Sequence, residues 1–282
     1  MNEVDSLMLV NGHSAGTLPI DDRGLAYGDG VFETIRCIDG KPILWAAHLA
    51  RLQRGCDLLG IKTTGNQTDL MQDLTRDRDR LFAHAPDDAI LKLLVTRGQG
   101  GTGYAPPLAQ LPNRMVSVNA YSPDQAAIQD GIHVSICETR LGINPGLAGV
   151  KHLNRLEQVL GAAEIKEGFG EGLMLDINEQ VIEGTRSNVF FVRDGKLITP
   201  ELDRCGVHGT LRAWLLATET VEVLPIPVTA LASVEEMFTC NSVYGIYPVT
   251  RLSGRGLERQ LDIGARTRGL QSRLRELGFR SC

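Results

Sequence analysis

Two kinds of hydrophobic pattern alternate along this chain. Short apolar segments bounded by turn residues are typical of β-strands, and apolar residues every third or fourth position are typical of amphipathic helices. Strands are predicted over residues 7–10, 31–38, 41–44, 89–96, 115–121, 132–138, 173–177, 189–192 and 196–199. Helices are predicted over residues 46–59, 67–82, 154–167 and 210–216, and within 261–277.

A polar segment interrupts these elements near the middle of the chain. Residues 122–130 read Ser-Pro-Asp-Gln-Ala-Ala-Ile-Gln-Asp and separate two strand-rich stretches. Such composition is typical of a linker between domains. We therefore expect a small N-terminal domain over 1–121, an interdomain linker over 122–130 and a larger domain over 131–282. Hairpins mixed with helices indicate an α+β fold, with α/β-like order in the second half.

Composition narrows the class of protein. The 282 residues carry 29 Lys and Arg against 34 Asp and Glu, so the net charge is −5, and 43% of residues are apolar. The chain is too apolar for a disordered protein and holds no apolar run near the roughly 18 residues of a membrane span. Its acidic balance does not favour nucleic-acid binding. We expect an enzyme that acts on a small molecule, with no nucleic acid or membrane partner.

The cysteines and histidines do not form recognisable metal or redox motifs. Six cysteines occur without a CxxC pair, and the six histidines are scattered. Two acidic residues lie within the first five, where a secretion signal carries basic ones. We expect a cytoplasmic protein whose cysteines are small reduced core residues, and no metal site.

Two short motifs match enzyme patterns without the required context. Residues 98–103, Gly-Gln-Gly-Gly-Thr-Gly, fit the dinucleotide fingerprint, but two prolines follow where its helix should begin. Residues 12–16, Gly-His-Ser-Ala-Gly, fit the nucleophile elbow of hydrolases, but an extended segment follows instead of a helix. We therefore predict neither dinucleotide binding nor a serine nucleophile at Ser14.

Three separate segments, 22–34, 144–157 and 183–190, carry polar groups that local structure does not explain. Together they resemble the fold-type IV pyridoxal-phosphate enzymes, which include branched-chain aminotransferases, D-amino acid aminotransferases and aminodeoxychorismate lyases. The resemblance covers nearly the whole chain, and the run 144–159 is most similar to the lyases. It implies a small α/β N-terminal domain, a larger C-terminal α/β pseudo-barrel domain that binds the cofactor, pyridoxal 5'-phosphate (PLP) as that cofactor, and a homodimer.

Lys151 and Glu183 are the central candidates. Lys151 lies between apolar Val150 and Leu153, where a poorly solvated amine can attack a carbonyl. Taken alone, Lys151 could be a surface residue at a helix start and Glu183 a solvated turn residue. The resemblance implies that Lys151 binds the cofactor covalently and moves protons, and that Glu183 pairs with the pyridine nitrogen.

The cofactor's phosphate needs several dispersed donors. The resemblance places Arg51, in the run His-Leu-Ala-Arg-Leu, at the phosphate, although a surface arginine on a helix is the alternative. Thr210 and Leu211 open a predicted helix, where backbone N–H groups bind anions. The remaining candidates for cofactor binding are Ser187, Asn188 and Ser242.

Candidates on the substrate side are Phe32, Arg97 and Tyr104. Arg97 begins a glycine-rich loop that resembles the family's mobile loop, and Phe32 and Tyr104 could equally be core or lid residues. Many of the lyases have an arginine where this chain has Thr102, so Arg97, Arg155 or Arg186 would have to bind the substrate carboxylates instead.

The resemblance implies a PLP-dependent lyase that converts 4-amino-4-deoxychorismate into 4-aminobenzoate and pyruvate, a step of folate biosynthesis. An aminotransferase for D-amino or branched-chain amino acids is the alternative, because it uses the same lysine, carboxylate and phosphate groups. A binding protein that retains the fold without activity is the remaining reading.

Overall fold

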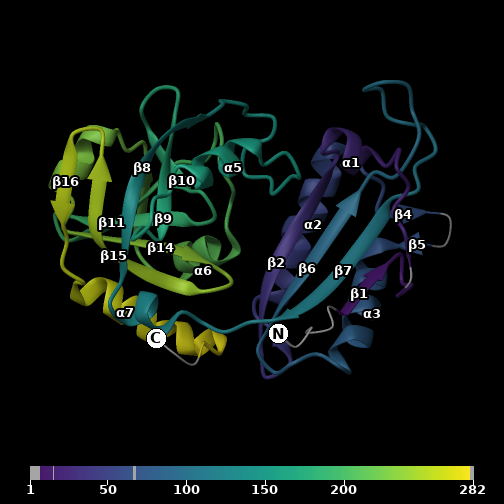
Figure 1. Cartoon of the computed structure of the whole chain (residues 1–282), viewed down its shortest axis with the longest axis horizontal. Helices are drawn as coiled ribbons and strands as arrows, with labels where there is room; N and C mark the ends of the chain where they lie inside the picture. The colour runs from purple at the N-terminus through teal and green to yellow at the C-terminus, as the bar shows by residue number, and fades with distance from the viewer. Residues whose placement is uncertain (1–6, 15, 66–67, 280–282) are drawn as a thin grey trace. The chain divides into compact units, whose positions relative to one another are not determined.

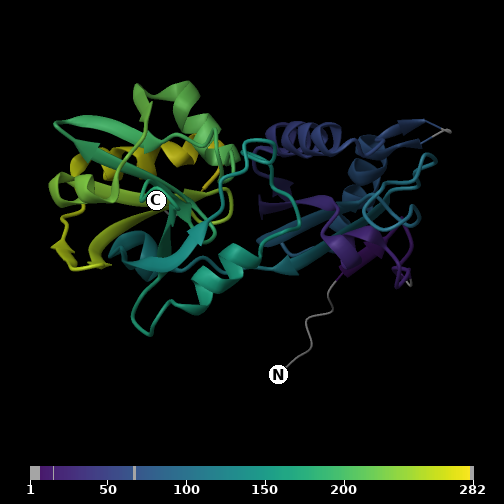
Figure 2. The same ribbon diagram turned by 90° about the horizontal axis from the view of Figure 1, so that it is seen from above.

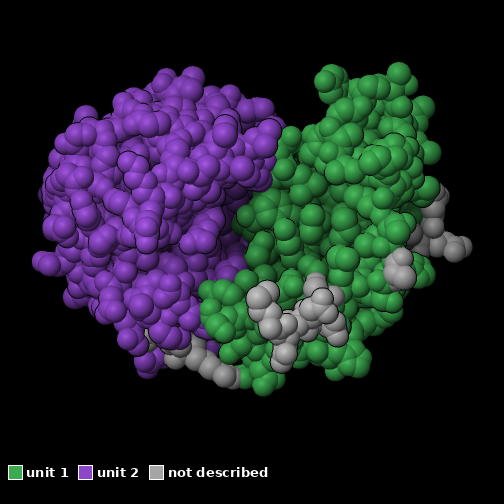
Figure 3. Space-filling view, in the orientation of Figure 1, with its two compact units in different colours: residues 1–122, 150–154 green, residues 123–149, 155–282 purple. Residues whose placement is uncertain are grey.

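The computed structural model describes residues 7–14, 16–65 and 68–279 of the chain. The chain divides into two compact units (Figure 3). Unit 1 comprises residues 1–122 and 150–154, and unit 2 comprises residues 123–149 and 155–282. Each unit has its own buried apolar core.

Unit 1 is built on an antiparallel sheet of five strands in the order β1-β7-β6-β2-β3 (Figure 1). The strands are β1 (Leu7–Val10), β2 (Gly30–Ile38), β3 (Lys41–Pro42), β6 (Ala89–Thr96) and β7 (Asn113–Ala120). β4 (Thr64–Gly65) and β5 (Thr68–Asp69) form a separate two-stranded pair. Alternate residues of β6 are fully buried, as expected for a strand with one face on the core. The five predicted strands of this half are confirmed, with β3 shorter than expected.

Three helices belong to unit 1: α1 (Arg23–Tyr27), α2 (Trp45–Leu59) and α3 (Leu70–Phe82). Figure 2 shows α2 along one face of the sheet, and its buried side chains include His48, Arg51, Leu52 and Cys56. It ends at Gly60 in the left-handed conformation that glycine adopts readily. The helix predicted over 67–82 begins at Leu70, because the Asp69 side chain caps its first turn. Residue 67 lies outside the described residues.

Unit 2 contains a curled mixed sheet in the order β10-β9-β8-β15-β14-β11-β12-β13, with β16 paired to β15. The strands are β8 (Ile132–Leu141), β9 (Glu171–Asp176), β10 (Val181–Gly184), β11 (Asn188–Arg193), β12 (Lys196–Pro200), β13 (Val221–Leu224), β14 (Glu236–Asn241), β15 (Gly245–Gly254) and β16 (Leu257–Gln260). Every residue of β9 is buried, so this strand is covered on both faces. The α+β class is confirmed.

The helices of unit 2 are α4 (Gln125–Gln129), α5 (Leu156–Ala163), α6 (Thr210–Thr218) and α7 (Ala265–Arg273), with 3₁₀ turns η1 (Val228–Ser233) and η2 (Leu274–Leu277). The segment expected as a linker contains α4, whose Ala127 and Ile128 are buried in the core of unit 2. This part of the expected linker thus packs as a helix, and the predicted domain boundaries at 121 and 131 stay a prediction. Among the described residues, no helix is long and apolar enough to cross a lipid bilayer.

Residues 150–154 differ from the expectation that they belong to the larger domain. The Phe32 N–H donates to the Lys151 carbonyl at 3.0 Å, and the Leu153 N–H donates to the Gly30 carbonyl at 2.9 Å. Val150 is 8% exposed and packs in the core of unit 1. Pairing with β2 thus groups this segment with unit 1, although it follows a segment of unit 2 in sequence.

Candidate active site

Lys151 is held against β2 in unit 1. Its backbone carbonyl accepts the Phe32 N–H, and its Nζ lies 4.3 Å from the centroid of the Phe32 ring. An ammonium group over an aromatic face is attracted by the negative face of the ring. The structure therefore brings Phe32 and Lys151 together, and a single strand fixes both.

Arg51 belongs to a buried charged cluster with Glu33 and His48. Its Nε donates to Glu33 Oε1 at 2.8 Å and its Nη2 donates to Glu33 Oε2. His48 Nδ1 lies 2.6 Å from the same Oε2, and all three side chains are at most 7% exposed. Two of the three guanidinium nitrogens thus bind a carboxylate, which anchors Arg51 in this cluster.

The cluster shifts the pKa of both of its other members. Burial alone would raise the pKa of Glu33, but the adjacent Arg51 guanidinium holds it below its usual value. Burial lowers the pKa of His48, and the charges of Arg51 and Lys151 lower it further against the opposing effect of Glu33. Glu33 is therefore a carboxylate and His48 a neutral imidazole at pH 7. Glu33 lies in the segment 22–34 and His48 begins the run His-Leu-Ala-Arg-Leu, but neither was assigned a role from the sequence.

The loop after β6 carries Arg97 and Tyr104. Arg97 donates from Nε and Nη2 to the Asp29 carboxylate at 2.7 and 2.9 Å and from Nη1 to the Gly60 carbonyl at 2.9 Å. These contacts use all of its nitrogen atoms, so the geometry gives Arg97 a structural role and does not support the expected contact with substrate. Tyr104 is 85% exposed and therefore accessible to a ligand.

Glu183 in β10 is the principal candidate of unit 2. It is 4% exposed, and its Oε2 accepts the Val207 N–H at 2.8 Å. Gln158 Nε2 lies 3.4 Å from the other carboxylate oxygen. Glu183 is thus no solvated turn residue, because the sheet buries it and one backbone amide orients it.

Asn188 and the start of α6 adjoin the segment that Glu183 holds. Asn188 Nδ2 donates to the Val207 carbonyl at 2.9 Å, and a Cβ on Gly209 would lie 1.9 Å from Asn188 Oδ1. Gly209 is the N-cap of α6 and offers no side-chain oxygen to its first turn. Thr210 and Leu211 are both buried there. Backbone N–H groups at a helix start suit an anion.

Ser187 and Ser242, the two serine candidates of unit 2, are both buried. Ser187 Oγ donates to the buried carboxylate of Glu171 at 2.8 Å, which gives Ser187 a structural partner. Ser242 follows β14 and is 7% exposed. Arg186, considered for the substrate, has a side chain that is 66% exposed.

Sequence reasoning missed Arg212, the third residue of α6. Its side chain is 7% exposed, its Nη2 donates to the Pro200 carbonyl at 2.9 Å, and its buried Nε has no hydrogen-bond partner among the described residues. Burial lowers its pKa, with Glu183 and Cys240 acting in the opposite direction. The sequence signal that could have identified Arg212 is its position directly after Gly-Thr-Leu at the start of a helix. A helical side chain leans toward the N-terminus of its helix, so the Arg212 side chain leans toward the predicted anion site.

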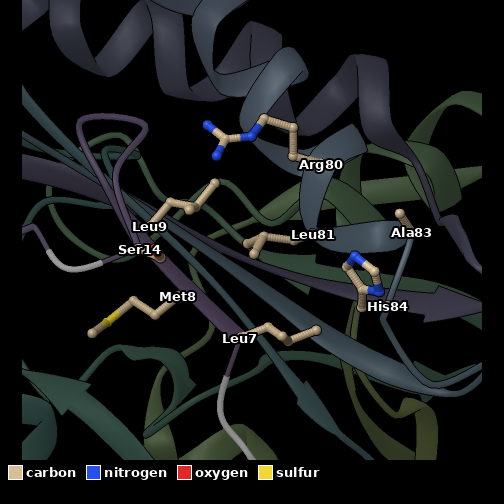
Figure 4. A pocket seen from close by; sticks show the side chains of 8 residues that line it. All are labelled: Leu7, Met8, Leu9, Ser14, Arg80, Leu81, Ala83 and His84. Atoms are coloured by element: carbon tan, nitrogen blue, oxygen red, sulfur yellow. The ribbon is translucent and has the colours of Figure 1, made fainter.

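A surface pocket in unit 1 contains none of the candidates. It has a volume of about 560 Å³ and is lined by Leu7, Met8, Leu9, Ser14, Arg80, Leu81, Ala83 and His84 (Figure 4). In Figure 4, Leu81 lies between Ser14 and His84. A serine nucleophile needs a base within hydrogen-bond reach. The expectation that Ser14 is no nucleophile stays a prediction.

Known proteins resemble this chain over most of its length. Its residues 30–252 match the family model described as amino-transferase class IV. The chain is 36% identical to an aminodeoxychorismate lyase of Vibrio harveyi, over 94% of this chain and 98% of that one. It is 30% identical to a putative branched-chain-amino-acid aminotransferase of Methanocaldococcus jannaschii, over 91% and 89%.

A solved structure gives the same result for the fold. The 4-amino-4-deoxychorismate lyase from Pseudomonas aeruginosa superposes with a TM-score of 0.87 at 42% identity, and the match covers 96% of this chain and 98% of that one. The mixed α/β fold expected for fold-type IV enzymes is thereby confirmed. This chain belongs to the class IV aminotransferase family.

Proposed function

We propose that this protein is a PLP-dependent lyase that converts 4-amino-4-deoxychorismate into 4-aminobenzoate and pyruvate. The observation that carries the PLP-dependent chemistry of this proposal is the placement of Lys151, whose amine lies over the Phe32 ring and whose backbone is fixed by β2. A lysine held in this way can bond an aldehyde and afterwards move a proton.

The residues present suit the chemical groups of PLP. Lys151 offers an amine for the aldehyde, and Glu183 offers a buried carboxylate for the pyridine nitrogen. The first turn of α6 and the buried Arg212 offer backbone N–H groups and positive charge for the phosphate. Arg51, Asn188 and Ser242 complete the proposed cofactor residues, and Ser187 acts through its hydrogen bond to Glu171.

The chain itself links Lys151 to the segment that Glu183 anchors. The Gly149 N–H donates to the Gly206 carbonyl at 2.9 Å, and the His208 N–H donates to the Gly149 carbonyl at 3.1 Å. Val207, between those two residues, donates its N–H to Glu183. Lys151 follows Gly149 by two residues in the sequence.

Each residue then has a defined task in the reaction. When bound, PLP provides a conjugated ring that takes up the electrons released as a carbon–hydrogen bond breaks. Glu183 holds a proton at the ring nitrogen, and Lys151 Nζ accepts the proton from the amine-bearing carbon of the substrate. The C–O bond to the enolpyruvyl group breaks, and the leaving group becomes pyruvate by taking up one proton, which balances the proton that Lys151 has accepted. The carbocyclic ring of the substrate becomes aromatic, so no oxidant or second substrate is required. General-base assistance of this kind contributes about 10²–10⁴-fold in rate.

The relatives favour a lyase over an aminotransferase. The Vibrio harveyi protein of 36% identity and the Pseudomonas aeruginosa structure of 42% identity are both named as lyases, whereas the named aminotransferase reaches 30%. The run Lys-His-Leu-Asn-Arg-Leu-Glu-Gln at 151–158 is the local feature that resembles the lyases.

Two parallel assays test the proposal. Purified protein loaded with PLP is incubated with 4-amino-4-deoxychorismate, and release of 4-aminobenzoate is measured. A second reaction contains D-alanine or L-leucine with 2-oxoglutarate, and glutamate formation is measured. Efficient 4-aminobenzoate release with little glutamate is the expected result. The reverse pattern would establish the aminotransferase instead.

A homodimer in the cytoplasm completes the proposal. Leu156, Val159 and Leu160 of α5 are each more than half exposed and are spaced to form one apolar helix face. Such a face suits a second copy of the chain, and light scattering would give the mass of a dimer. The five cysteines among the described residues are buried free thiols, which suits a reducing compartment.

A further inference from the structure

The glycine-rich loop after β6 is folded around one arginine side chain, Arg23 of α1. Arg23 is 4% exposed, and its guanidinium donates to carbonyl groups of this loop. The contacts run from Nη1 to the carbonyls of Gly100 at 3.3 Å, Gly103 at 3.1 Å and Ala105 at 3.4 Å, and from Nη2 to the carbonyl of Tyr104 at 2.9 Å. Four carbonyl groups thus converge on a single buried cation.

The glycines make this convergence possible. Gly98, Gly100, Gly101 and Gly103 all have positive φ, between 56° and 99°. A Cβ on Gly101 would lie 2.2 Å from the Ala105 carbonyl oxygen and 3.1 Å from Arg23 Nη1. Only glycine fits such close approaches. The glycines of residues 98–103, the run that matches the dinucleotide fingerprint, therefore allow the backbone to direct several carbonyl groups at the Arg23 guanidinium.

Asp29 connects the arginine to the rest of unit 1. It accepts from Arg23 Nε at 2.9 Å and from both Nε and Nη2 of Arg97. Burial would raise the pKa of Asp29, but the hydrogen bonds from Arg97 and Arg23 keep it below its usual value. Arg97 in turn donates to the carbonyls of Leu59 and Gly60 at the end of α2. Two arginines and one carboxylate thereby tie the loop to the sheet and to α2.

The same contacts fix the backbone of an exposed aromatic residue. Arg23 holds the Tyr104 carbonyl, while the Tyr104 ring lies edge-on to the Tyr27 ring at 5.3 Å. The Arg23 guanidinium also lies 5.0 Å from the centroid of the Tyr27 ring. Tyr104 therefore has a fixed backbone, although the residue as a whole is 85% exposed.

We propose that Arg23 is a positioning residue, which holds the loop 98–105 in one conformation so that Tyr104 is ready to contact the substrate. This inference rests on the proposed function for the identity of the substrate. Arg23 is buried and acts only through the loop. Lysine cannot replace it, since an ammonium group offers three donors at one point and cannot reach four carbonyls and a carboxylate together.

Limited proteolysis tests the holding of the loop without reference to activity. Chymotrypsin cleaves after aromatic residues and leucine unless proline follows. Its sites between β6 and β7 are therefore Tyr104, inside the loop 98–105, and Leu108, three residues after it, whereas Leu111 precedes a proline. Arg23→Gln is compared with Arg36→Gln in the PLP-loaded protein, because Arg36 is an equally buried arginine of the same unit, paired with Asp88 at 2.7 Å. Mass spectrometry identifies the fragments.

Arg23→Gln should raise the rate of cleavage at these two sites by about tenfold or more, since the loop loses several charge-assisted hydrogen bonds. Arg36→Gln should leave cleavage at these sites within about twofold of the parent, because a surface loop opens locally. Unchanged cleavage in Arg23→Gln, or an equal rise in both variants, would overturn the proposal. If Arg23→Gln does not fold, Arg23→Lys takes its place under the same criteria.

Kinetics supply the second readout. For the lyase reaction, Arg23→Gln should raise KM for 4-amino-4-deoxychorismate about tenfold and change kcat less than about threefold, because loss of positioning weakens binding and leaves the reacting groups in place. The absorbance of bound PLP should equal that of the parent. A fall in kcat with unchanged KM contradicts the assignment. If the parent itself releases no 4-aminobenzoate, the proposed function fails, and proteolysis still decides whether Arg23 holds the loop.

Discussion

The two units hold their candidate residues by different means. In unit 1 the charged side chains hold one another: Glu33 binds Arg51 in a bidentate pair, and Asp29 joins Arg23 to Arg97. In unit 2 Glu183 and Asn188 bind backbone groups instead: Glu183 accepts the Val207 N–H, and Asn188 donates to the Val207 carbonyl.

This difference determines what a substitution leaves behind. Removing one member of a buried ion pair leaves the other as an uncompensated charge, which costs about 3–5 kcal/mol. Removing a side chain that binds a backbone group leaves only one polar group to be satisfied, at about 1–3 kcal/mol. Unit 1 should therefore be the more sensitive unit for stability. The chain has two tryptophans, Trp45 in unit 1 and Trp214 in unit 2, so Trp→Phe backgrounds report each unit separately.

The largest effect is expected for chemistry and not for stability. Lys151→Ala should lower the rate of 4-aminobenzoate release by at least about 10³-fold, because the general base is lost together with the covalent attachment. The visible absorbance of bound PLP should disappear as well. Lys92→Ala is the matched control, since its Nζ lies 5.9 Å from the same Phe32 ring. Full turnover in Lys151→Ala, or an equal loss in Lys92→Ala, would refute the assignment of Lys151.

Glu33→Gln should give the largest loss of stability. The substitution leaves the guanidinium of Arg51 buried without its carboxylate, at about 3–5 kcal/mol of unfolding free energy. Urea unfolding followed by Trp45 fluorescence should show the loss, and the transition followed by Trp214 should move less. Glu222→Gln, which removes a partly exposed partner of Lys196, is the control and should not shift either transition. Equal shifts of both tryptophan signals would argue against separate responses of the two units.

Much of the fold could be predicted from local pattern. The strand over 89–96 matches β6 at both ends, and the helix over 46–59 matches α2 within one residue. Apolar spacing and a terminal glycine specify such elements without tertiary context. No strand was predicted between residues 200 and 260, where β13 to β16 lie. β15 is buried over most of its length, so the alternation that would identify it is absent.

Candidates for the site could be named from the sequence only where a motif contained them, and their roles stay predictions. Lys151, Arg51 and Glu183 came from runs that resemble a known family. Glu33 and His48 were not assigned, because their roles depend on burial and on pairing across 15 to 18 residues of sequence. Arg97 was predicted to contact the substrate, and that contact stays a prediction. Its guanidinium binds Asp29 and the Gly60 carbonyl at the end of α2, which the sequence did not indicate. Partners of this kind are set by tertiary packing, which one-dimensional spacing does not encode.

His48 offers a pH test of the unit 1 cluster. Its pKa in the folded protein is below the value of 6.5 for the free side chain, chiefly because of burial. Below pH 6.5 the unfolded chain takes up a proton that the folded chain does not, so the unfolding free energy falls as pH falls, by up to about 1.4 kcal/mol per pH unit. The stability that neutral His48 contributes is thus present above pH 6.5 and is lost toward the folded pKa.

The measurement is the unfolding free energy from pH 7 to pH 5, followed by Trp45. His48→Gln should remove this part of the pH dependence. His84→Gln, at an exposed histidine of the same unit, should keep it. A parent and a His48→Gln variant with the same slope would mean that His48 does not titrate differently in the folded and unfolded chains.

The smallest effect on stability is expected for Arg212→Met in unit 2. This substitution tests whether unit 2, unlike unit 1, tolerates the loss of a buried charge. Arg212 is a buried cation that forms no ion pair among the described residues, so in Arg212→Met the relief of a buried charge should offset the lost hydrogen bond to the Pro200 carbonyl. The unfolding free energy of the cofactor-free protein should therefore change by less than about 1 kcal/mol. Its charge should matter once the phosphate is bound, because burial strengthens the attraction to an anion. Titration should therefore show weaker binding of PLP, by about tenfold, with binding of pyridoxal, which lacks the phosphate, unchanged. A loss of several kcal/mol without cofactor would show that unit 2 depends on its buried charge as strongly as unit 1 does.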